Sequence, residues 1–320
     1  MRKAFAYSAT FICTIIGAGF ASGREIALYF GTLAYPWVLV SAGVLSALAF
    51  VFLEVGRISD GKPSEFLLGK YAYVLDGFIV VSNFIVIIAM VAGADFIVYD
   101  AFGVSFGGVI TAIFALTIAT RLDKLKLVNT VLLPVIIVFV TLLFFNTKAI
   151  FGGEASLARP VLYASLNISA GGLILSKCPA ISRKNSVACA VIIFALLAFL
   201  MSAEYFVVRI APSDMPVLSF ARSLHLGAFA QIFIYIAIFT TLASSLTLAS
   251  GYSTRRGALI IFIACPLALV GFARFVNFTY PAIGVGGAVI AFIATFRVIF
   301  CGQKNIVIEE RCLLLPKRKP

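Results

Sequence analysis

Three glycines, Gly17, Gly19 and Gly23, fall within seven positions of the first long apolar run, and the charged pair Arg24 and Glu25 follows at once. Each glycine costs about 1 kcal/mol relative to alanine in a helix interior. Backbone groups released from a helix inside lipid must be satisfied by protein, water or a ligand. The stretch therefore predicts a broken helix whose bare peptide groups form half of a solute and ion site. Close packing of two helices through small residues is the alternative.

A second polar interruption lies in the sixth apolar run, where Asn167, Ser169, Gly171 and Gly172 stand among apolar residues. Paired interruptions at corresponding positions of two halves are the best sequence pointer to a transporter site. Each break exposes N–H groups at a positive dipole end and carbonyl groups at a negative one. We therefore expect both runs to be unwound around a small solute that carries both charges.

Hydroxyl side chains crowd the eighth apolar run between residues 240 and 250. Thr241, Ser244 and Ser245 share one helix face by their spacing. Hydroxyl and carbonyl oxygens are hard ligands, which suit a small cation such as sodium. The alternative is that each hydroxyl bonds the carbonyl group four residues back in its own helix.

Four ionisable residues lie within or near the apolar runs: Arg24, Glu25, Asp95 and Glu204. Ionisable groups at membrane depth are costly and usually functional. Arg24 is a candidate outer gate with Asp95 or Glu204 as its partner, although Arg24 and Glu25 could instead cap a restarted helix. We expect Asp95 and Glu204 near the outer ends of their runs, close to water. They are the carboxyl groups to test if transport is coupled to protons.

The composition places the chain in the membrane. Of its 320 residues 62% are hydrophobic and 12% charged, and the mean hydropathy is +1.11, whereas soluble domains carry about 25% charged residues. A membrane helix needs about 20 apolar residues. The sequence therefore predicts an all-α integral membrane protein with one domain over 1–300, a basic cytoplasmic tail over 301–320, and about ten transmembrane helices at 4–30, 33–56, 72–96, 103–120, 126–146, 158–178, 186–210, 226–250, 256–274 and 278–300.

The cations alternate between successive connections. Nineteen of the 25 Lys and Arg residues fall in the terminal segments and in every second connection, five fall in the others, and Arg24 lies within the first run. Because cytoplasmic loops carry the excess of Lys and Arg, both termini are expected in the cytoplasm. The net charge of +12 then reflects membrane orientation, and no nucleic-acid partner is expected. The cysteines lack metal-ligand spacing and His225 is the only histidine, so we expect no disulfide and no enzyme.

Residues Gly17 to Ile26, with the sequence GAGFASGREI, resemble the opening motif of the YkvI-like family of membrane proteins. The ten-run layout resembles the amino acid–polyamine–organocation superfamily with the leucine-transporter fold. The resemblance implies that 1–150 and 151–300 are inverted repeats of five helices, with helices 1 and 6 broken around the substrate. In sodium-coupled members of that fold, one ion lies between carbonyl groups of helix 1 and a Ser/Thr pair of helix 8.

The resemblance implies a sodium site formed by Cys13, Ile16, Thr241, Ser244 and Ser245. The candidate substrate contacts are Gly17, Ala18, Gly19, Asn167, Ser169 and Gly171, with Asn83, the only amide in the third run, as a further candidate. The implied function is a sodium-coupled secondary transporter of a small amino acid, a related zwitterion or an amine, in the plasma membrane of a bacterium. It needs no cofactor besides sodium. A proton-coupled transporter, a channel and a membrane sensor on the same scaffold are the alternatives.

Overall fold

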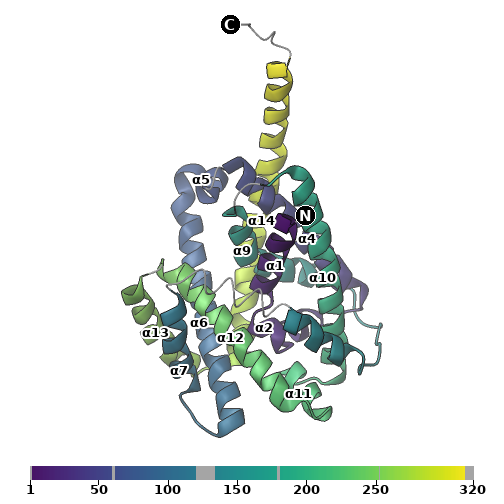
Figure 1. The fold of residues 1–320 in the computed structure, drawn as a ribbon, viewed down its shortest axis with the longest axis vertical. Helices are drawn as coiled ribbons and strands as arrows, with labels where there is room; N and C mark the ends of the chain where they lie inside the picture. Colours follow the sequence, from purple (N-terminus) through teal and green to yellow (C-terminus); the bar gives the residue numbers. More distant parts are fainter. Residues whose placement is uncertain (1, 60–61, 120–133, 179–180, 252, 314–320) are drawn as a thin grey trace.

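The computed structural model describes residues 2–59, 62–119, 134–178, 181–251 and 253–313, which form helices joined by short connections (Figure 1). Five helical segments, 36–59, 63–102, 183–210, 227–250 and 272–300, are long and apolar enough to cross a membrane. The helices are α1 (Arg2–Ile15), α2 (Ala18–Ala21), α3 (Arg24–Phe30), α4 (Pro36–Ser59), α5 (Pro63–Leu68), α6 (Ala72–Phe102), α7 (Gly107–Ala119), α9 (Ala158–Ser176), α10 (Arg183–Ile210), α11 (Pro216–Ser223), α12 (Gly227–Ser250), α13 (Thr254–Ala268) and α14 (Phe272–Leu313), with a further helix at Pro134–Phe144.

Each apolar run coincides with a helix or, for the first run, with the three pieces α1 to α3. The fifth run, 126–146, begins outside the described residues, and its described part contains the helix Pro134–Phe144. The last run continues as helix to Leu313 and so includes most of the segment predicted as a tail; residues 314–320 lie outside the described residues. Figure 1 shows the last turns of α14 projecting away from the bundle.

The first run is broken twice, as the glycines predict. The amide of Gly17 donates to the carbonyl of Ile15 at 2.7 Å, two residues back instead of four, so the helical ladder stops at the end of α1. The second break is at Gly23, whose φ of +78° lies in the left-handed region that glycine adopts readily. Here the amide of Val217 at the start of α11 donates to the Ser22 carbonyl at 3.1 Å, which satisfies a group that α3 does not use.

The sixth run is not broken, so that prediction was wrong: α9 is one continuous helix through Asn167 and Ser169. The Asn167 side chain donates to the Tyr163 carbonyl at 3.0 Å, and the Ser169 hydroxyl donates to the Leu166 carbonyl at 2.6 Å. These polar side chains therefore bond their own helix.

The two glycines of α9 serve close packing. A Cβ atom on Gly171 would lie 2.8 Å from the Phe11 ring of α1, and one on Gly172 would lie 2.9 Å from the Phe52 ring of α4. Small residues that let aromatic rings approach a backbone are typical of helix interfaces in membranes. This explains why the glycines stand in α9 without interrupting it.

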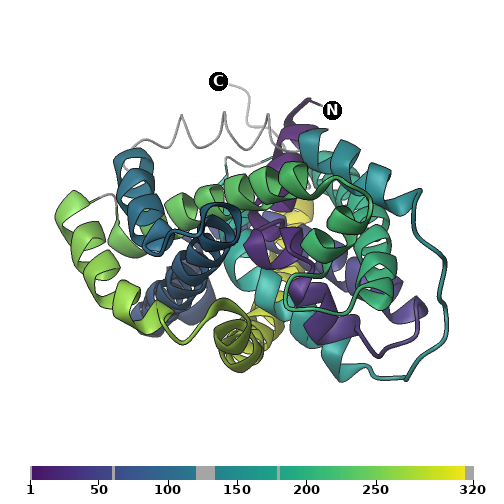
Figure 2. The same ribbon diagram turned by 90° about the horizontal axis from the view of Figure 1, so that it is seen from below.

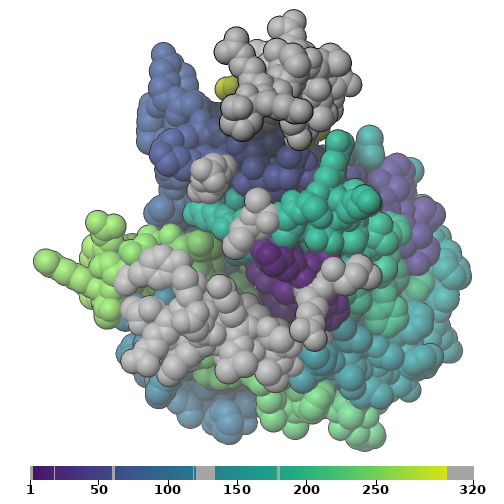
Figure 3. All heavy atoms as spheres, turned by 45° about the horizontal axis from the view of Figure 1, so that its top comes forward, coloured from purple at the N-terminus to yellow at the C-terminus, as the bar shows by residue number. Residues whose placement is uncertain are grey.

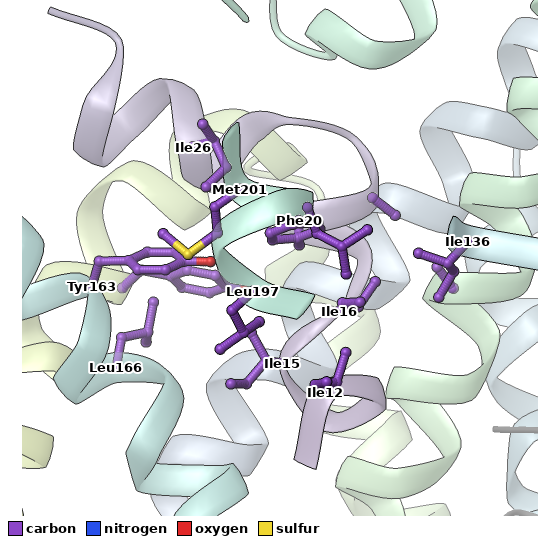
Figure 4. Close-up of a cluster of buried hydrophobic side chains, with 14 of the residues drawn as sticks. Ile12, Ile15, Ile16, Phe20, Ile26, Ile136, Tyr163, Leu166, Leu197 and Met201 are labelled. Carbon is purple, nitrogen blue, oxygen red and sulfur yellow. The ribbon is translucent and has the colours of Figure 1, made fainter. Parts of the chain in front are cut away.

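Helix α9 lies at the centre of the molecule, in contact with α1, α4 and α14. Its packing on α14 is close, because a Cβ atom on Gly284 or Gly287 would collide with the carbonyl groups of Leu162 or Ser165. Figure 4 shows part of the buried apolar cluster, which includes Tyr163 of α9 and Met201 of α10. Figure 3 shows the start of α1 at the surface next to α10, and α12 passes close to α2 (Figure 2).

A connection between distant segments joins the end of α3 to the loop before α9. Leu33 and Glu154 form a short parallel bridge. From α10, the Tyr205 hydroxyl donates to the Leu33 carbonyl at 2.8 Å, and Arg209 donates to the carbonyls of Gly31 and Gly152, each at 2.9 Å. Side chains of α10 thus hold the backbone on both sides of this connection.

The second break gives a first prediction. We expect Gly23→Ala to lower the stability of the folded protein by about 1–3 kcal/mol, because alanine is strained at positive φ. Its methyl group would also meet Val217 at 3.1 Å. Thermal unfolding in detergent measures the change. Gly251→Ala is the control, since Gly251 has a φ of +57° but no atom lies within 4 Å of the place that a Cβ atom would take; equal losses in both variants would contradict a packing contribution at Gly23.

Candidate solute and ion site

A cavity of about 90 Å³ lies where the break between α1 and α2 meets α6, α9, α12 and α14. Pockets for drug-sized ligands measure about 300–1,000 Å³, so this cavity suits a smaller solute. Backbone, hydroxyl, amide and carboxyl groups converge on it from separate helices. The polar and glycine residues that line it are Cys13, Thr14, Gly17, Gly19, Glu25, Ser82, Asn83, Asn167, Ser169, Thr240, Thr241, Ser244, Ser245 and Tyr280.

The hydroxyl face of α12 lies directly against the first break. A Cβ atom on Gly17 would lie 3.1 Å from Thr241 Oγ1, so the peptide backbone of the break touches this side chain. The Thr241 hydroxyl donates to the Ala237 carbonyl and the Ser244 hydroxyl to the Thr240 carbonyl, each at 2.8 Å. A hydroxyl that donates its proton keeps its oxygen lone pairs, so these two oxygens can still accept from or ligate a bound species.

The structure brings most of the candidate ion ligands together. Cys13, Thr241, Ser244 and Ser245 all line the cavity. Ile16 does not line it, and its side chain is buried in the apolar core.

The candidate substrate contacts divide in the same way. Gly17, Gly19, Asn83, Asn167 and Ser169 line the cavity. Gly171 and Ala18 do not line it. Gly171 faces the Phe11 ring, and Ala18 is the first residue of α2.

Both amides of the cavity donate to their own helices. Asn83 Nδ2 donates to the Ile79 carbonyl at 2.8 Å, and Asn167 donates to the Tyr163 carbonyl. Each amide has a second N–H and a carbonyl oxygen with which to bind a solute. The sequence analysis did not single out Tyr280, Ser82 or Met90, which also line the cavity. Ser82 adjoins Asn83 in the sequence, whereas a lone tyrosine in an apolar run carried no signal.

The predicted partners of Arg24 were wrong. Arg24 pairs with Asp214, in the connection before α11, at 3.3 Å, and both residues line a surface depression of about 690 Å³. Asp95 accepts a hydrogen bond from the Gly108 amide at 3.2 Å and so caps the first turn of α7. The sequence analysis did not consider Asp214, because it stands in a polar loop where charged residues are common.

Glu25 and Glu204 are both buried. Glu25 is 5% exposed and lines the cavity, whereas its neighbour Arg24 lines the surface depression. Glu204 is 2% exposed, which contradicts the expectation that it lies close to water. The start of α3 therefore presents Glu25 to the cavity and Arg24 to the surface depression.

Comparison with solved structures defines the class. No model of a known protein family matches the chain. A manganese transporter of Eremococcus coleocola aligns with a TM-score of 0.58 and 14% identity, covering 93% of this chain and 78% of that one. Mhp1, a nucleobase-cation-symport-1 family transporter, aligns with a TM-score of 0.53 and 14% identity, covering 92% of this chain and 74% of that one. The chain is thus an all-helical membrane protein with the leucine-transporter fold.

Comparison of sequences also finds a relative of this chain. The uncharacterized membrane protein YkvI of Bacillus subtilis (strain 168) is 26% identical in an alignment of length 317. The alignment covers 86% of this chain and 90% of that protein. The chain is a homologue of YkvI. This confirms the resemblance drawn from residues Gly17 to Ile26.

Proposed function

We propose that the chain is a secondary transporter that moves a small amino acid, or a related zwitterion or amine, coupled to sodium. One observation carries this proposal: the broken first run meets the hydroxyl face of α12 at a polar cavity inside a bundle of membrane helices. Because α9 is continuous, its contribution comes from the Asn167 and Ser169 side chains and not from bare backbone.

The sodium ion would lie between the end of α1 and α12. Its ligands would be the carbonyls of Cys13, Ile16 and Thr241 and the hydroxyls of Ser244 and Ser245. The Ser244 hydroxyl already donates its proton within α12, so its oxygen faces an ion only as an acceptor, which suits a hard cation. The solute would occupy the rest of the cavity, beside Gly19, Asn83 and Asn167.

The proposed cycle is alternating access between two inverted repeats, 1–150 and 151–300, of five spans each, with both termini in the cytoplasm of a bacterium. The Arg24–Asp214 pair would be the outer gate, because it lies in the surface depression while Glu25, the next residue, lines the cavity. The Arg24 side chain is 16% exposed and that of Asp214 is 70% exposed. Water therefore reaches the acidic partner and screens the pair, which lowers the cost of opening the gate.

The ion site gives a second prediction. Ser244→Ala combined with Ser245→Ala is expected to abolish the sodium dependence of ligand binding and uptake, because both hydroxyl ligands are removed. Thermal shift with and without sodium measures binding, since a ligand of the folded state raises its apparent stability. Ser250→Ala is the control, because this buried serine of the same helix does not line the cavity. An unchanged sodium response in the double variant would rule out this ion site.

Binding and flux measurements distinguish a transporter from a channel and from a sensor. A thermal-shift screen of amino acids and amines, with and without sodium, identifies a ligand for flux measurements in vesicles. A transporter gives saturable uptake driven by a gradient. Current without saturation would identify a channel, and binding without flux would identify a sensor.

A further inference from the structure

Two buried carboxyl groups lie on α3 and α10, which pack against each other outside the proposed sodium site. Glu25 of α3 and Glu204 of α10 are both more than nine-tenths buried, and they interact electrostatically with each other. In each group, the Oε2 atom has no hydrogen-bond partner among the described residues. Polar atoms buried in this way are rare in folded proteins and call for a specific explanation.

Tyrosines surround the two carboxyl groups. Tyr163 of α9 interacts electrostatically with Glu25 and Glu204, and Tyr280 of α14 interacts with Glu25. The rings of Tyr29 and Tyr163 meet edge to face, with centroids 5.5 Å apart. The Tyr29 hydroxyl is also buried and without a hydrogen-bond partner in the described part of the chain. The Tyr163 hydroxyl is likewise buried without such a partner, so the two carboxyl groups lie among phenol groups that carry no compensating positive charge.

The arginines that follow or precede these glutamates within five residues of the sequence bind other groups. Arg24 pairs with Asp214, and Arg209 donates to two loop carbonyls. The other buried glutamate, Glu54, is different, because Arg57 binds its Oε2 at 2.7 Å. Among the described residues, no ion pair forms with Glu25 or Glu204.

Two like charges in a buried, uncompensated setting are strongly unfavourable. Removing a carboxylate from water costs several kcal/mol unless a cation or hydrogen bonds compensate it, and two carboxylates that share a site cannot both remain ionised. We propose that Glu25 and Glu204 form a proton-binding site, in which the pair holds at least one proton at neutral pH.

The two carboxyl groups differ in their access to the cavity, which Tyr280 of the cluster also lines. Glu25 lines the cavity and packs over Gly19, whereas Glu204 does not line it. A proton from water in the cavity would therefore bind the Glu25 carboxylate first and pass to the Glu204 side of the cluster, and it would leave by the same route. This site adds a second cation to the proposed sodium-coupled cycle, and its existence does not depend on transport.

Infrared spectroscopy of the purified full-length protein tests the site without a substrate. Protonated carboxyl groups have a carbonyl stretching band that carboxylates lack. We expect this band in the wild type at neutral pH, a loss of part of it in Glu25→Gln or Glu204→Gln, and no loss in Glu54→Gln, because Glu54 is paired with Arg57. Absence of the band in the wild type at neutral pH, or an unchanged band in both of the first two variants, would overturn the proposal.

Sodium and pH distinguish the bound cation. At fixed pH, sodium should leave the band unchanged; a band that sodium removes would show that the pair binds sodium and would overturn the proton assignment. Because the folded protein holds a proton that the unfolded chain releases, its unfolding temperature should fall as pH rises above neutral. The double variant Glu25→Gln with Glu204→Gln should show a smaller fall, and an equal fall would count against the site.

Discussion

Gly17→Val is expected to weaken sodium-dependent binding and uptake strongly. A Cβ atom at this position would lie 3.1 Å from Thr241 Oγ1 and 3.3 Å from its methyl group, and valine adds two further methyl groups. The side chain would push α12 away from the break and separate the proposed ion ligands. Overpacking costs about 1–3 kcal/mol, which corresponds to a loss of affinity of roughly fivefold to 150-fold if the cost falls on the bound state. Thermal shift with sodium and uptake into vesicles measure the loss.

Gly77→Val is the matched control for that variant. Gly77 lies within α6, and no atom lies within 4 Å of a Cβ atom built on it. Valine there should fold with little change and keep its sodium response. If Gly17→Val retained the wild-type response, the contact between the break and α12 would have no part in ion binding.

Gly287→Val is expected to give the largest loss of stability. A Cβ atom on Gly287 would collide with the carbonyl of Ser165 in α9, and backbone cannot move aside as a side chain can. Relieving the clash requires α14 to move off α9, the central helix of the core. The cost is at least the roughly 1–3 kcal/mol of ordinary overpacking. Thermal unfolding in detergent measures the loss, and poor yield of folded protein is the extreme outcome.

The neighbouring residue provides the control. Gly286 is on the same helix, but a Cβ atom there meets the ring of Phe78, which is a side chain. Gly286→Val should therefore be much less destabilising than Gly287→Val. Equal losses from both substitutions would contradict the importance of the backbone contact between α9 and α14.

Glycine explains both the success and the failure of the sequence analysis. The glycines of the first run indicate a break, and the structure contains one there; those of the sixth run gave the same signal, and α9 is continuous. A glycine can interrupt a helix or let a neighbouring side chain approach it, and the local sequence does not distinguish these two roles. The neighbours that decide, Phe11 and Phe52, lie more than a hundred residues away from Gly171 and Gly172.

The charged residues show the same limit. The sequence places Arg24, Asp95 and Glu204 within or near apolar runs, but it does not show which of these side chains are in contact. Asp214, the partner of Arg24, stands in a loop, and Asp95 caps the helix that follows its own. The hydroxyl pattern of α12 was more informative, because its residues share one face of one helix and need no distant segment to bring them together.

The contacts from α10 to the outer connection have a consequence for how the sequence can change over evolution. Tyr205 and Arg209 bind carbonyl oxygens at positions 31, 33 and 152, which every amino acid provides. These hydrogen bonds therefore depend on the side chains of the two donors and not on those of the acceptor residues. Homologues should retain a phenol and a guanidinium on this helix even where a residue at an acceptor position differs.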